Sequence, residues 1–406
     1  MINIHPFTAE RPRSEDADRI ASVPYDVVST AEARELAADE PDSFLRVIRP
    51  EIELGEEADP YSDAVYRRGR MNLDRFREQG LLVEDDQPGI YLYRLTWRGA
   101  TQTGIVCCCD AAQYRSGLIK KHEFTRPEKE DDRTRHLMAS RAHAEPIFLA
   151  FQDDPGIKSL VAGDTGREPD CAFTAGDGVR HECWRVGDPD RYVECFAGLD
   201  SMYIADGHHR SAAAARAAEE CMGGNADHDG NEEYNRILAV CFPAGELNIL
   251  PYNRVVRDRA GLDPERLVAR VADIGAVSPV EDGIPASRGE FRMWVGNSWH
   301  SVVIDDSRID HEDPVESLDC ALLQSLVLDP ILGIGDPRTD GRIEFVGGIR
   351  SLEELVERAG ADGVAFSMHP TSMEELLSVA DSGRTMPPKS TWFEPKLRSG
   401  LFVHRF

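Results

Sequence analysis

Residues 203–220, YIADGHHRSAAAARAAEE, constrain the fold more than any other part of this 406-residue chain. Apolar residues run up to Asp206, Gly207 follows, and an alanine-rich stretch typical of a helix begins at once. Glycine permits a backbone turn that other residues resist. The pattern therefore predicts a strand, a tight turn and a helix, as in α/β proteins.

The polar residues of this turn indicate an anion site. A helix N-terminus offers unpaired N–H groups to an anion, and Arg210 adds a bidentate donor. His208 and His209 are candidates to donate to phosphate oxygens or to carry a proton. Asp206 is a candidate to cap the helix, hold a metal or orient a substrate amine. The alternative is a plain structural turn, in which Asp206 is only a cap and the histidines are solvated.

Composition excludes several classes of protein. The hydrophobic fraction of 41% and the charged fraction of 29% are typical of a soluble globular protein, and we expect no membrane span. The first residues show no secretory signal, so we expect a cytoplasmic protein. The net charge of −27 makes nucleic acid an unfavourable partner. Any anion must then be held by a local site.

The cysteines and lysines narrow the kinds of site that the chain can contain. Nine cysteines without a CxxC pair argue against a zinc site or a disulfide framework, and the run 107–109 predicts a strand with alternating buried thiols. Only six of the 46 basic residues are lysines, and five of them lie in residues 120–129 and 389–396. A lysine ammonium is a compact point charge, so it binds a phosphate in a way that an arginine guanidinium does not reproduce. The two lysine-rich segments are therefore candidate phosphate-binding segments. Chance clustering is the alternative explanation.

The first lysine-rich segment, residues 118–136, carries candidate catalytic groups. Glu123 is flanked by basic side chains that hold it ionised, as a general base for a hydroxyl requires. His122 and Glu123 do not begin a zinc-protease HExxH motif, because position 126 is arginine. Lys129 and Arg133 share a face if the segment is helical. The alternative is an exposed charged helix with internal ion pairs.

The second lysine-rich segment, residues 385–401, predicts an irregular loop fixed by two prolines and a glycine. Such loops often bind anions. The alternative is a docking tail anchored by Trp392 and Phe393. Its candidate binding side chains are Lys389, Ser390, Thr391 and Lys396.

Periodicity predicts a mixed α/β chain in three regions: residues 1–100, residues 101–260 with an elaboration at about 152–200, and residues 261–406. Helices are expected at 62–80, 263–275, 316–328, 351–360 and 372–383. Strands are expected at 89–97, 104–111, 146–151, 235–242, 291–296, 301–305, 342–348 and 363–368.

Motifs along nearly the whole chain carry a family resemblance. They are PYDVVS, FLRVIRPE, KHEFT, PIF, IADGHHRSAAA, LPYNRVV, RIEFVGG and MPPKSTWFEPKLRSGL, in that order. Together they resemble the bacterial and archaeal domain-of-unknown-function family numbered 1015. That resemblance implies a fold but no activity.

A more distant resemblance implies chemistry. KHE followed by PI and DGHHR is similar to the free-serine kinases of the ParB/sulfiredoxin-like superfamily, which implies such a core at 101–260. It implies Glu123 as catalytic base with His122 and Asp206 beside it, and Thr125 as an accessory group. It further implies nucleotide phosphates and substrate on the turn from Asp206 to Arg210, with Gly207, His208, His209 and Arg210. Lys129 and Arg133 are further candidates for the phosphates, because phosphoryl transfer needs positioned cations.

The implied reaction is phosphoryl transfer between ATP or ADP, with Mg²⁺, and a small metabolite such as L-serine or O-phosphoserine, in either direction. It needs positioned cations and a base near the accepting hydroxyl. Two alternatives stay open: a ParB-type nucleotide switch and a phosphoserine phosphatase. A homodimer is a possible assembly.

Overall fold

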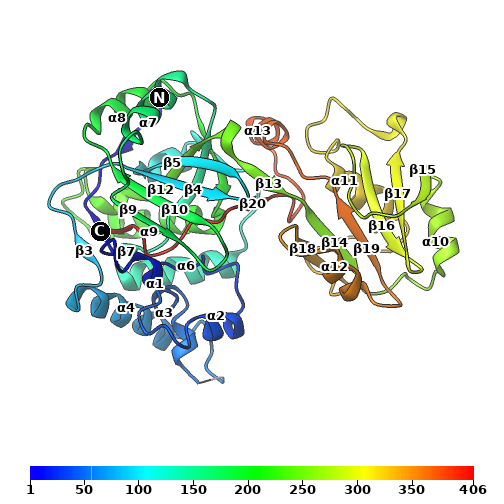
Figure 1. The fold of residues 1–406 in the computed structure, drawn as a ribbon, viewed down its shortest axis with the longest axis horizontal. Helices are drawn as coiled ribbons and strands as arrows, with labels where there is room; N and C mark the ends of the chain where they lie inside the picture. The colour runs from blue at the N-terminus through cyan, green and yellow to red at the C-terminus, as the bar shows by residue number, and fades with distance from the viewer. Residues whose placement is uncertain (56) are drawn as a thin grey trace. The chain divides into compact units, whose positions relative to one another are not determined.

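The computed structural model describes residues 1–55 and 57–406 and confirms a mixed α/β fold (Figure 1). The chain divides into two compact units. Unit 1 comprises Met1–Lys121, Thr125–Leu247 and Pro395–Phe406, and unit 2 comprises His122–Phe124 and Asn248–Glu394. The boundaries predicted from the sequence, near residues 100 and 260, differ from this division.

Unit 1 is built on a nine-stranded mixed sheet in the order β6-β11-β8-β12-β5-β4-β10-β9, with β1 also paired to β5. The pairs β11–β6 and β12–β8 are parallel, and the other pairs are antiparallel. The strands are β1 (Ile4–His5), β4 (Tyr91–Trp97), β5 (Ala100–Asp110), β6 (Ile119–Lys120), β8 (Ile147–Phe151), β9 (Cys171–Thr174), β10 (Arg180–Arg185), β11 (Met202–Asp206) and β12 (Arg236–Pro243).

The central strands β5 and β12 are buried along most of their length, which explains their continuous apolar sequence. Cys107 and Cys109 belong to the main hydrophobic core, and Cys108 between them does not. The predicted alternation of the sulfurs is therefore confirmed. The core is completed by side chains from α7 (Pro155–Asp164), α8 (Asp190–Phe196) and α9 (His208–Gly224).

The segment read as an elaboration, residues 152–200, forms α7, β9, β10 and α8. Its two strands extend the main sheet, because β10 pairs with β4 from Arg180–Thr96 to Arg185–Tyr91. The pairing explains why a polar stretch with weak periodicity is ordered. The main-chain N–H and C=O groups of β10 form hydrogen bonds with the neighbouring strand β4.

A second layer of unit 1 packs its own core of residues from the helices and the small sheet β3-β2-β21-β7. The strands are β2 (Ala9–Arg11), β3 (Val83–Glu84), β7 (Ala142–His143) and β21 (Val403–Arg405). The other helices of unit 1 are α1 (Ala17–Ile20), α2 (Thr30–Leu36), α3 (Leu45–Ile48), α4 (Asp63–Glu78), α5 (Ala111–Arg115) and α6 (Pro127–Ser140), of which α5 contributes Ala111 to the main core.

Unit 2 contains a six-stranded antiparallel sheet in the order β15-β17-β16-β19-β14-β18 and a two-stranded pair β13–β20. The strands are β13 (Asn248–Leu250), β14 (Tyr252–Val256), β15 (Gly275–Val280), β16 (Glu290–Val295), β17 (Ser298–Ile304), β18 (Ile343–Gly347), β19 (Val364–Met368) and β20 (Trp392–Glu394). The helices are α10 (Pro264–Val271), α11 (Asp319–Leu323), α12 (Leu352–Ala359) and α13 (Met373–Asp381).

Local sequence signals set where these helices begin. Asp263 caps α10 by accepting from the main-chain N–H of Arg266, and Pro264 occupies the first turn. Ser372 and Glu375 form a capping box at the start of α13. The helices predicted from apolar periodicity in this region are confirmed, except that the segment 316–328 is α-helical only in α11 and continues as a π-helix over Gln324–Leu328.

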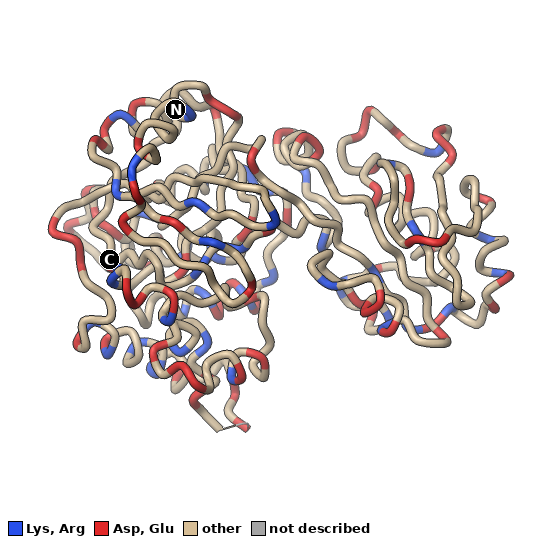
Figure 2. Tube along the Cα trace, viewed as in Figure 1, with Lys and Arg blue, Asp and Glu red and all other residues tan. Residues whose placement is uncertain are grey.

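Charge is distributed over both units. Figure 2 shows Asp and Glu along many segments of each unit, as the net charge of −27 requires. Within the described residues, every helix is too short or too polar to cross a membrane.

Candidate active site

The turn after β11 has the conformation expected from its glycine. Gly207 adopts φ of 93° and ψ of 33°, and α9 begins at His208. A Cβ atom at this position would lie 3.1 Å from Nε of Arg210. Both the backbone and the packed guanidinium therefore favour glycine. In the described part of the chain, no side chain caps α9 at this end.

Asp206 joins the turn to the C-terminal segment. Its Oδ1 accepts from the N–H of Gly207 at 2.8 Å, and its Oδ2 accepts from Nζ of Lys396 at 3.1 Å. Burial acts to raise the pKa of Asp206, but Lys396 and Arg210 outweigh it and hold the pKa far below its ordinary value. Asp206 is therefore ionised at neutral pH. The pair links residues 190 positions apart.

Arg210 lies beneath the turn with its side chain 8% exposed. Its Nη1 donates to the carbonyl of Pro146, and its Nη2 lies 3.7 Å from Asp206 Oδ2. Among the described residues its Nε has no hydrogen-bond partner. This geometry gives Arg210 a role in holding the turn from below.

Arg210 belongs to a buried charged group that sequence analysis missed. Glu145 lies 3.7 Å from Nη1 of Arg133 and accepts from the N–H of Tyr25 at 3.1 Å. The guanidinium of Arg133 lies 4.0 Å from the centre of the Tyr25 ring. Burial raises the pKa of Glu145, although Arg210 and Arg133 act to lower it.

The nearest sequence signals for this group are the motifs PYDVVS, which contains Tyr25, and PIF, which follows Glu145. Arg133, His136, His143, Glu145 and Arg210 line a cavity of about 30 Å³. Such a cavity has room for about one water molecule. The group is therefore nearly close-packed.

The two histidines of the turn, His208 and His209, differ in their surroundings. His208 is buried, and that burial lowers its pKa to about 3, so its imidazole is neutral at pH 7. Nε2 of His209 accepts from the N–H of Arg126 at 3.1 Å. Arg126 immediately precedes α6. His209 therefore brings the first lysine-rich segment to the turn.

Two other predicted residues on and before α6 form side-chain hydrogen bonds away from the turn. Thr125 Oγ1 donates to Glu130 at 3.1 Å, and Lys129 Nζ donates to the hydroxyl of Tyr61 at 3.2 Å. Arg133 points instead into the buried group under the turn. The predicted sharing of one helix face by Lys129 and Arg133 thus leads to two different environments.

A second group of predicted residues lies within unit 2. His122 Nε2 lies 3.4 Å from Thr391 Oγ1, and the carbonyl of His122 accepts from the N–H of Met386 at 2.8 Å. Ser390 Oγ donates to the carbonyl of Pro387 at 2.6 Å. The two lysine-rich segments thus meet here.

Lys389 has a distinctive environment in the same group. Its φ is 59°, its carbonyl accepts from Nη2 of Arg254 at 3.2 Å, and its ammonium lies 5.6 Å from the centre of the Tyr252 ring. Glu123 belongs to unit 2 with His122, whereas Lys121 and Thr125 on either side belong to unit 1. The chain therefore crosses between the units twice within five residues.

Comparisons with known proteins give the family and several distant structures. A family model described as "Protein of unknown function (DUF1015)" matches residues 4–321. No curated protein matches the chain.

Three solved structures illustrate the distant similarity. C-terminally truncated SbnI from Staphylococcus aureus has 12% identity and a TM-score of 0.40, covering 74% of this chain and 87% of its own. Free serine kinase in complex with AMP has 14% identity and a TM-score of 0.36, covering 73% and 92%. A mutant of that kinase in complex with ADP has 16% identity and a TM-score of 0.35, with the same coverage.

Proposed function

Because the chain belongs to the DUF1015 family, for which no function is established, we propose its function from the site itself. It transfers a phosphoryl group between ATP or ADP and a small hydroxylated metabolite, with L-serine or O-phosphoserine as the first candidates. The observation that supports this proposal is the meeting of Asp206, Lys396 and His209 with Arg126 at the start of α9.

The phosphates bind at the N-terminus of α9, where main-chain amides and the helix dipole favour negative charge. Lys396 supplies a cation beside Asp206, and Gly207 lets the backbone approach the phosphate. His208, which is neutral at pH 7, and His209 act as hydrogen-bonding groups. Phosphoryl transfer requires this kind of preorganised charge stabilisation more than covalent chemistry.

Arg210 and Arg133 lie beneath the turn before α9 and do not contact the phosphates in this proposal. Their contacts with Glu145 and Pro146 hold the turn in place. They also contribute positive potential beneath the phosphates from nearly buried positions. We assign them to positioning, and Lys129 to the outer edge of the nucleotide site.

Glu123 is the proposed base for the hydroxyl. Arg126 is bonded to His209, and Glu123 is three residues before it. Chain connectivity alone keeps their Cα atoms within about 11 Å, whatever the arrangement of the two units. The proposed binding groups for the metabolite are His122, Thr125, Lys389, Ser390 and Thr391.

Asp206 is the candidate ligand for Mg²⁺, because its ionised carboxylate lies at the phosphate end of α9. Mg²⁺ is commonly held by one or two carboxylates together with substrate phosphates. The metal would neutralise charge on the transferred phosphoryl group.

Phosphorus NMR tests the proposal. Purified protein is incubated with Mg²⁺ and ATP or ADP, with L-serine or O-phosphoserine in turn. Interconversion that needs both partners supports transfer. Phosphate release from O-phosphoserine without nucleotide would instead indicate a phosphatase, and nucleotide hydrolysis independent of serine would indicate a switch.

A further inference from the structure

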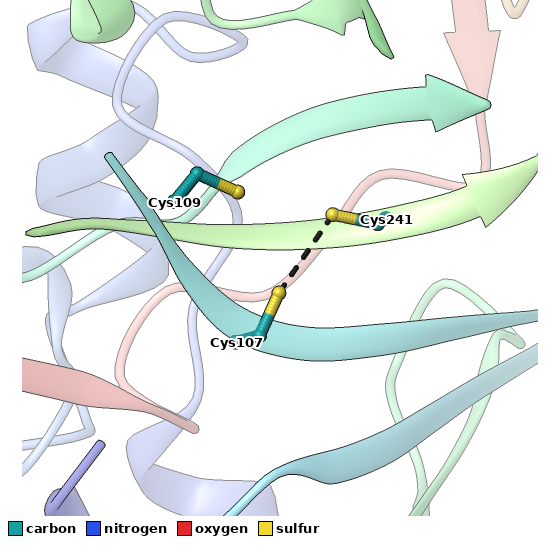
Figure 3. A group of neighbouring side chains, drawn as sticks. All are labelled: Cys107, Cys109 and Cys241. Atoms are coloured by element: carbon teal, nitrogen blue, oxygen red, sulfur yellow. Dashed lines mark hydrogen bonds between the residues drawn. The ribbon is translucent and has the colours of Figure 1, made fainter. Parts of the chain in front are cut away.

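Three cysteine sulfurs converge in the core of unit 1. Cys107 and Cys109 lie two residues apart on β5, so their side chains share one face of the sheet. Cys241 on the neighbouring strand β12 pairs with Ile105, which lies on that same face. The three Sγ atoms lie within 4.8 Å of one another, with Cys107 and Cys241 at 3.9 Å (Figure 3).

The surroundings of this thiol cluster (Cys107, Cys109 and Cys241) are apolar. All three residues are 0% exposed and belong to the main core with neighbours such as Ile105 and Ile237. Among the His, Cys, Asp and Glu side chains of the described residues, the thiol cluster is the group whose ligand atoms lie close enough together to hold one metal ion. It contains sulfur ligands alone.

The spacing matches one ion held by three sulfurs. Metal–thiolate bonds of about 2.3 Å place three sulfurs around a central ion at separations of about 4 Å. Structural zinc takes four ligands, whereas soft thiolates also select Cu(I). A closed apolar core with three sulfurs favours the ion that accepts low coordination.

We propose that the thiol cluster is a binding site for one Cu(I) ion. This proposal is independent of the phosphoryl-transfer reaction. When Cu⁺ enters, the S–H bond of one thiol breaks, its proton leaves to solvent, and a sulfur–copper bond forms. The other two sulfurs donate lone pairs, and no group is oxidised or reduced. One positive charge enters and one leaves, so the core gains no net charge.

Cys108 provides a matched control. It lies on the same strand, is equally buried, and faces the opposite side of the sheet. Replacing it with alanine removes a core thiol without touching the cluster. Cys107→Ala, Cys109→Ala and Cys241→Ala each remove one ligand.

The test uses reduced full-length protein handled without oxygen. Cu(I) is supplied as its bicinchoninate complex, and copper is also measured in protein purified from copper-supplemented cells, because entry to a buried site can require opening of the fold. We expect one Cu(I) per chain. Affinity should fall more than about 100-fold in each cluster variant, beyond the loss usual for an outer-shell change. Cys108→Ala should bind as the parent does.

X-ray absorption of the copper-loaded parent protein tests the site without any variant. Three sulfur ligands at about 2.3 Å would support the cluster. Absence of copper in both preparations, binding unchanged by the cluster substitutions, or a preference for Zn²⁺ would each overturn the proposal. In the first case the three thiols serve packing alone.

Discussion

Lys396 shows how one residue connects distant motifs. Its ammonium is 3.1 Å from Asp206, yet it lies in a segment that reads from sequence as either an anion loop or a docking tail. It contacts the turn and also precedes the buried C-terminal strand β21. The turn therefore depends on a residue outside its own segment.

Lys396→Ala is expected to weaken nucleotide binding by about 10- to 100-fold, as loss of a charged hydrogen bond usually does. Lys158→Ala is the matched control, because Lys158 is on α7 and contributes nothing to the turn. Isothermal titration with ADP measures both. Equal affinities in the two variants would remove Lys396 from the phosphate site.

Gly207→Ala is expected to destabilise the protein more than Gly230→Ala. The two glycines have φ of 93° and 94°, so both substitutions incur a left-handed backbone cost of about 1–2 kcal/mol. Only Gly207 also has Arg210 within 3.1 Å, whereas position 230 is open. Guanidinium unfolding measures the difference. Equal losses would show that the guanidinium moves aside without cost.

Glu123→Gln is expected to lower transfer by about 100- to 10,000-fold, the usual contribution of a general base. Nucleotide affinity should change little, because the amide keeps the size of the side chain. Single-turnover phosphorus NMR and ADP titration separate the two effects. Normal turnover in this variant would exclude Glu123 as the base.

At the scale of elements, the hydrophobic pattern predicts the strands and helices well. The strand–turn–helix of residues 203–220, the strand around Cys107 and the helices of unit 2 are confirmed. The polar segment at 152–200 gave weaker signals, because β9 and β10 are ordered by pairing with β4 rather than by their own periodicity. Pairing partners are a property of the sheet.

Buried histidines on several elements of unit 1 predict acid sensitivity. Burial lowers the pKa of His136 to about 4 and the pKa of His181 and His208 to about 3. The unfolded chain, with a histidine pKa near 6.5, therefore binds more protons, and stability falls as pH drops below about 6.5. The slope approaches about 1.4 kcal/mol per pH unit for each histidine.

Guanidinium unfolding of unit 1 at pH 7 and pH 5 checks this slope, with tryptophan fluorescence as the signal. Glu145 opposes the trend, since its raised pKa makes burial less costly at low pH. His311→Gln, at an exposed histidine, should leave the slope unchanged. A flat profile would show that the three imidazoles gain protons without unfolding.

At the scale of the whole molecule, the chain builds two units with separate hydrophobic cores. Unit 2 is nearly continuous, and only His122–Phe124 come from elsewhere. Residues 248–394 expressed alone are therefore expected to unfold cooperatively. Calorimetry of this fragment measures that directly. A fragment without a transition would show that unit 2 depends on unit 1.

The types of the elements, the glycine turn before α9 and the alternation of the cysteines on β5 can all be predicted from the amino-acid sequence. These features depend on neighbours a few residues apart, where backbone sterics and hydrophobic periodicity act. The tertiary fold is needed to bring Lys396 to Asp206, Glu145 to the N–H of Tyr25, and Cys241 to Cys107 and Cys109. Those contacts depend on strand order and register, which place residues more than 100 positions apart on the same face of a sheet or beneath the same turn.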